Sequence, residues 1–141
     1  MLACSIGYCL ALLYVTLLSE VRYTTNDLYT KPNFKILGLK RYYIINFWHL
    51  EFDKLIFFLV ELIGNIVLLV PFPFMLYYFW HRKLSTGMLL LMIFLTTLSI
   101  ETLQYIFKIG VFDIDDLILN FAGGLIGTLL FNFIYRKFLK Q

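Results

Sequence analysis

Carboxylate and amide side chains interrupt three otherwise apolar stretches of this sequence. Residues three or four positions apart share one face of a helix, and most of these polar side chains recur at that spacing. A lone carboxylate is costly in an apolar medium, so each one must be paired, hydrated or protonated. We therefore expect the polar side chains to meet in one binding pocket. The candidate residues are Glu61, Asn65, Glu101, Gln104, Asp113, Asp115, Asp116 and Asn120.

Grouped carboxylates allow two kinds of chemistry, namely acid–base catalysis and the binding of a divalent cation through oxygen ligands. Glu101 is the candidate base, and Asp113, Asp115 and Asp116 are the candidate metal ligands. Asp113 or Asp115 has a structural alternative, because an acid before a helix caps its exposed N–H groups. Asp116 and Asn120 have another, which is to hydrogen-bond neighbouring helices. The sequence contains no Gly-x-Ser-x-Gly, His-Glu-x-x-His or P-loop motif. We favour a binding role without cofactor over an enzyme, and leave the enzyme open.

The composition places these residues in a membrane. Hydrophobic residues make up 61% of the chain and charged residues 15%, against about 45–50% and 25% in soluble proteins. About 20 apolar residues cross a bilayer as a helix. We predict an all-α membrane protein, a single domain over residues 1–141, folded as a bundle of four transmembrane helices. The predicted helices are residues 1–18, 55–80, 85–107 and 117–135.

Prolines and glycines add two details to this bundle. Pro71 and Pro73 lie inside the second predicted helix and should kink it, because proline removes a backbone donor. Gly123 and Gly127 form a GxxxG motif in the fourth helix, which favours close packing of two helices.

The alternating direction of the helices brings the polar residues to one side of the membrane. Glu61 follows the start of its helix, Glu101 precedes the end of its helix, and Asn120 follows the start of the last one. The loop Ser19–Lys54 mixes charges with aromatic residues, which suits the membrane–water boundary.

Charge distribution bears on orientation and on partners. The basic residues of the turn 81–83 and of the tail (Arg136, Lys137 and Lys140) crowd the membrane edge, and the positive-inside rule then predicts both termini in the cytoplasm of a multi-pass protein. The net charge of +3 is too dispersed for nucleic acid. We expect membrane lipids as partners, with an envelope lipid-linked glycan as one option, and the sequence leaves the oligomeric state open.

Three stretches together resemble the VanZ-like family. They are residues 65–71, the motif Glu101-Thr-Leu-Gln104, and residues 112–127 with the pattern Asp-x-Asp-Asp-x-x-x-Asn-x-x-Gly-x-x-x-Gly. The resemblance is strongest over residues 40–135. It implies an integral membrane protein of the bacterial cell envelope, in a family whose named member is associated with low-level resistance to the glycopeptide teicoplanin.

This sequence departs from the family pattern at two places. Pro73 stands where the family usually has glycine, and Gly110-Val111 stands where an arginine often precedes the acidic block. Lys108 is near enough to substitute for that arginine.

Three functions fit these features. The leading hypothesis is a protein that binds an envelope lipid head group or glycan in the polar pocket and so lowers susceptibility to glycopeptide antibiotics. The second is a metal-dependent enzyme acting on a phosphorylated envelope lipid. The third is a small lipid or solute transporter gated at the Pro71/Pro73 break.

Overall fold

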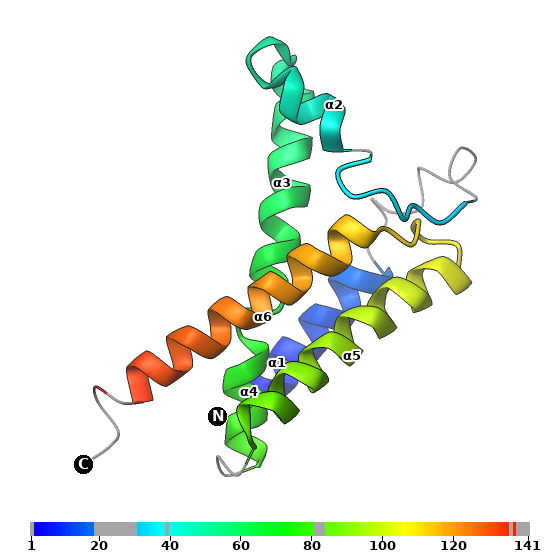
Figure 1. Cartoon of the computed structure of the whole chain (residues 1–141). Coiled ribbons are helices and arrows are strands. Elements are labelled where there is room, and N and C mark those ends of the chain that lie inside the picture. Colours follow the sequence, from blue (N-terminus) through cyan, green and yellow to red (C-terminus); the bar gives the residue numbers. More distant parts are fainter. Residues whose placement is uncertain (1, 19–30, 39, 81–83, 136, 138–141) are drawn as a thin grey trace.

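The computed structural model describes residues 2–18, 31–38, 40–80, 84–135 and 137. Regular structure within them is helical, apart from one isolated bridge between Asn33 and Asp113 (Figure 1). The elements are α1 (Leu2–Leu13), the π-helical η1 (Tyr14–Leu18), α2 (Lys40–Ile45), the 3-10 helix η3 (Phe47–His49), α3 (Phe52–Leu68), α4 (Phe72–Phe79), α5 (Thr86–Ile106) and α6 (Ile114–Ile134).

Three helical runs are long and apolar enough to cross a membrane: Phe52–Phe79, Thr86–Ile106 and Ile114–Ile134. The run Leu2–Leu18 is also apolar but shorter. The fold of the described residues is thus all-helical, three helical runs match predicted spans in length and apolar composition, and a fourth span at the N-terminus stays a prediction. The basic turn 81–83, Arg136, Lys140 and the loop residues 19–30, on which the orientation and part of the loop prediction depend, lie outside the described residues.

The second span consists of two helices rather than one. α3 ends at Leu68 and α4 begins at Phe72, with Pro71 at the N-cap. The N–H groups of the first helical turn have no partner within the helix, so a proline, which lacks this donor, fits there. In the middle of a helix it would remove a hydrogen bond. The interruption lies at the two prolines, which is where the sequence predicts a kink. The kink itself, meaning a bend within one continuous helix, stays a prediction.

An apolar core joins α4 to α5. Tyr77 of α4 also stacks on Phe131 of α6, with ring centroids 4.0 Å apart. In Figure 1 this core lies at the end of the molecule away from α2. Its buried residues are Leu69, Phe72, Leu76, Tyr77, Leu89, Ile93 and Ile100.

α6 crosses α3 at backbone distance (Figure 1). A Cβ atom on Gly123 would overlap the carbonyl oxygen of Ile66, and one on Gly127 would overlap that of Val70. Only glycine allows two backbones to approach so closely. We call this contact the glycine seam, and it fixes α6 against the span that carries Glu61.

Candidate functional site

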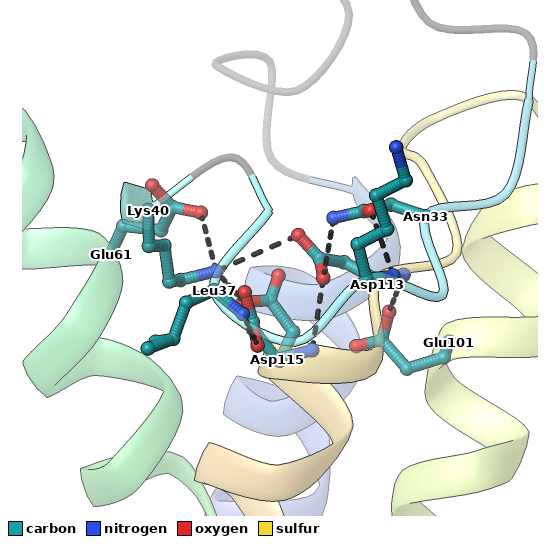
Figure 2. Close-up of polar contacts among 9 residues, drawn as sticks. Asn33, Leu37, Lys40, Glu61, Glu101, Asp113 and Asp115 are labelled. Carbon is teal, nitrogen blue, oxygen red and sulfur yellow. Dashed lines mark hydrogen bonds and ion pairs between the residues drawn. The ribbon is translucent and has the colours of Figure 1, made fainter. Parts of the chain in front are cut away.

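A buried lysine gathers the acidic residues at one end of the bundle. The Nζ atom of Lys40 lies 2.7 Å from Asp116 Oδ1, 3.3 Å from Glu61 Oε1 and 3.6 Å from Asp113 Oδ2 (Figure 2). The lysine comes from α2, the glutamate from α3, and the two aspartates from the start of α6. We call these four residues the Lys40 cluster. The start of α6 thus meets two elements, α2 and α3, that lie far from it in sequence.

The charge of Lys40 is stabilised by its neighbours. Its side chain is only 3% exposed, and a buried charge is costly unless it is paired and hydrogen-bonded. Burial lowers the pKa of Lys40, but the carboxylates of Asp116, Glu61 and Asp113 outweigh it and raise this pKa above its ordinary value. The lysine is therefore a fixed cation at neutral pH.

Asp113 links the cluster to α5 and caps α6. Its side chain accepts a hydrogen bond from the backbone N–H of Asp115 at 2.9 Å, as an N-cap residue does. It also accepts one from Asn33 Nδ2 at 3.2 Å. Its own backbone N–H donates to Oε2 of Glu101 at 3.3 Å. α6 begins at Ile114, earlier than the sequence analysis expected, because Asp113 caps it.

The segment 31–38 covers the start of α6. Asn33 donates its backbone N–H to Phe112 O at 2.8 Å and accepts from Ile114 N at 3.0 Å. Leu37 donates its backbone N–H to Asp115 Oδ1 at 2.8 Å (Figure 2). Part of the loop between the first two predicted spans is therefore bonded directly to the acidic block.

Two amides lie one helical turn beyond the Lys40 cluster, since Asn65 follows Glu61 on α3 and Asn120 follows Asp116 on α6. Within the described part of the chain, Asn65 Nδ2 and Asn120 Oδ1 are buried without a hydrogen-bond partner. The same holds for Asp115 Oδ2. Buried polar atoms normally have a partner, so these three mark places where a ligand or a water molecule would be stabilised.

Gln104 points elsewhere. Its Nε2 atom donates to the backbone carbonyl of Thr16 in η1 at 3.1 Å, and the residue is buried. Gln104 is one of the eight residues expected in one pocket. The structure joins it to the N-terminal helix rather than to the Lys40 cluster. Glu101, three residues earlier, contacts the acidic block through Asp113.

The acidic residues do not form a metal site in the described residues, where no three Asp, Glu, His or Cys side chains are grouped to hold an ion. Asp113 and Asp116 face the Lys40 ammonium, and Asp115 Oδ1 accepts the Leu37 N–H. Glu101, the candidate base, is 1% exposed. These contacts engage side-chain oxygens of all three aspartates within the protein, and the metal-dependent hypothesis stays a prediction.

Sequence reasoning missed Lys40, which it treated as one of several charges in the middle of a loop. It looked instead to Lys108, which is exposed and has a φ of 57° just beyond the end of α5. The one available signal was electrostatic, because a cation is one of the ways to stabilise acids inside apolar helices. That signal does not say which lysine or arginine supplies it.

Comparisons with known proteins support the resemblance. A family model described as VanZ/LLP1 matches residues 5–135. Searches of curated proteins and of solved structures gave no significant match. The matched range contains the Lys40 cluster, the glycine seam and the three spans. The chain belongs to the VanZ/LLP1 family.

Proposed function

We propose that this chain binds the head group of an envelope lipid, or a lipid-linked glycan, at the Lys40 cluster and thereby lowers susceptibility to glycopeptide antibiotics of the teicoplanin type. The observation that carries this proposal is the buried ammonium held among three carboxylates, with Glu61 midway along α3 and the two aspartates at the start of α6. α6 belongs to a candidate membrane span, so its start would lie at the depth of lipid head groups.

Exposure within the cluster is graded, which supports binding from one side. The side chain of Glu61 is 34% exposed and that of Asp116 is 17% exposed, while Asp113 and Lys40 are at 5% and 3%. Glu61 therefore forms the accessible edge. Its carboxylate would accept hydrogen bonds from an ammonium or hydroxyl group, and such donors are what an amine-bearing head group or a sugar offers.

The antibiotic part of the proposal is supported by family membership. With both termini in the cytoplasm, the cluster would face outward. A head group or glycan bound there would be less accessible to a glycopeptide. No catalytic step is needed for that effect.

The experiment compares variants in a susceptible bacterial cell and measures the minimal inhibitory concentration of teicoplanin. Wild type should raise it, and Glu61→Gln and Asp116→Asn should lose most of that protection because each removes one carboxylate charge. Glu51→Gln is the matched control, since Glu51 forms an exposed pair with Lys54. Cluster variants that protect as well as wild type, at equal membrane levels, would refute the proposal.

A further inference from the structure

A groove of about 380 Å³ lies between the N-terminal helical run α1–η1 and α5. Leu12, Leu13, Thr16 and Leu17 line one side of it, and α5 lines the other between Met92 and Leu103. The groove borders on α5, which is one of the helices able to cross a membrane. Its natural surroundings are therefore hydrocarbon.

The hydroxyl groups in the groove are already bonded. Thr16 donates to Leu12 O at 2.7 Å in its own helical run, and on α5 Thr96 and Ser99 likewise donate four residues back, at 2.8 and 2.7 Å. Such bonds within a helix satisfy the donor without water. The groove thus presents an apolar surface that hydrocarbon can contact without leaving these donors unpaired.

The length of the groove fits half a bilayer. The stretch of α5 from Met92 to Leu103 spans roughly 16 Å at 1.5 Å per residue. The hydrocarbon core of a bilayer is about 30 Å thick, so one leaflet contributes about half of that. One acyl chain of a single leaflet would fill such a length.

One end of the groove is bonded to residues near the polar site. Gln104, next to the lining residue Leu103, donates to Thr16 O. Glu101, next to the lining residue Ile100, accepts the N–H of Asp113 in the Lys40 cluster. Thr16 also lies in a π-helical turn, an irregularity frequent at functional sites. The groove and the polar site therefore share α5.

We propose that the groove between α1–η1 and α5 holds an acyl chain of the membrane lipid whose head group binds at the Lys40 cluster. This inference rests on the proposed function and adds the lipid tail to it. The ligand is then a complete membrane lipid, recognised at both its polar and its apolar part, rather than a soluble head group or sugar.

The test uses the full chain in nanodiscs that contain phosphatidylethanolamine with a photoreactive diazirine midway along one acyl chain. After illumination, peptide mapping should find the label on the groove-lining parts of α1–η1 and α5. Ser99→Phe and Thr96→Phe fill the groove and should each lower this labelling several-fold. Leu91→Phe is the matched control, because Leu91 is exposed on the same helix and does not line the groove.

Labelling spread over all lipid-facing helices, and unchanged by Ser99→Phe and Thr96→Phe, would overturn the acyl-chain site even if Asp116→Asn still lost protection against teicoplanin. A cross-link between two copies at these residues would overturn it too, since the groove would then be a protein interface. Labelling confined to the groove, with full protection by Asp116→Asn, would support the acyl-chain site and reject the proposed function.

Discussion

The two halves of α6 contact α3 by different means. At its start, Asp113 and Asp116 pair with the Lys40 ammonium, which also pairs with Glu61 of α3. Further along, Gly123 lies directly against the backbone of α3 at Ile66, and Gly127 lies against Val70 in the link between α3 and α4. The contact at the first half of α6 depends on charged side chains. The contact at the second half depends on glycines, which have no side chain. Packing therefore fixes the scaffold at the glycine seam, while the polar half retains the exposed Glu61 edge and unpaired polar atoms that suit ligand binding.

The largest expected effect is at the glycine seam. Gly123→Leu would force the α6 side chain into the Ile66 carbonyl, so the helices must separate. We expect a loss of more than about 3 kcal/mol, above the usual cost of overpacking, seen as little folded protein after purification. Gly64→Leu is the control, because nothing lies within 4 Å of a Cβ atom there. Equal yields for the two variants would show that the seam is not close-packed.

Lys40→Met tests the polar half. It would leave three carboxylates without their cation, and breaking a buried ion pair costs about 3–5 kcal/mol. Denaturant unfolding in detergent should show a destabilisation of that order. Lys54→Met, which breaks the exposed pair with Glu51, should leave unfolding unchanged. A Lys40→Met protein as stable as Lys54→Met would mean that the buried cluster does not form.

A smaller loss of stability is expected when a residue that caps a helix is replaced. The size of the loss should depend on whether that residue also bonds to other elements. Ser85 caps α5 by accepting from Met88 N, and Ser85→Ala should cost about 1 kcal/mol. Asp113→Ala removes the corresponding cap of α6, the bond from Asn33 and the ion pair with Lys40. Unfolding should therefore show a larger loss for Asp113→Ala. Equal losses would indicate that the links to Asn33 and Lys40 contribute nothing.

The smallest effect concerns pH. The pKa of Lys40 is raised on folding, so its contribution is complete below the ordinary lysine pKa of 10.5 and is lost as the pH rises through the raised value. The difference in unfolding free energy between wild type and Lys40→Met should stay constant from pH 7 to 10 and shrink above that. A difference that already shrinks near neutral pH would contradict the raised pKa.

Much of the fold could be predicted from the sequence, because apolar segments of membrane length are a strong signal. Because successive helices alternate in direction, the sequence also predicted that Glu61 lies at the same end of the bundle as Asp113 and Asp116, as the structure shows. The partner of these acids could not be predicted. In the sequence, Lys40 lies between two predicted spans in a stretch without periodicity. It begins the short helix α2, whose position depends on tertiary bonds such as that from Leu37 to Asp115. Helical spacing likewise predicted which face of its helix Gln104 lies on, but it could not predict that Gln104 bonds to Thr16.

Lys40 and the α6 carboxylates should act as one energetic unit. A double-mutant cycle on the unfolding free energy, with Lys40→Met, Asp116→Asn and the double variant, tests it most directly. Residues in contact couple by about 0.5–3 kcal/mol, and the 2.7 Å pair should give a value of at least about 1 kcal/mol. Additive effects of the two substitutions, within about 0.3–0.5 kcal/mol, would show that the lysine and the carboxylate act independently.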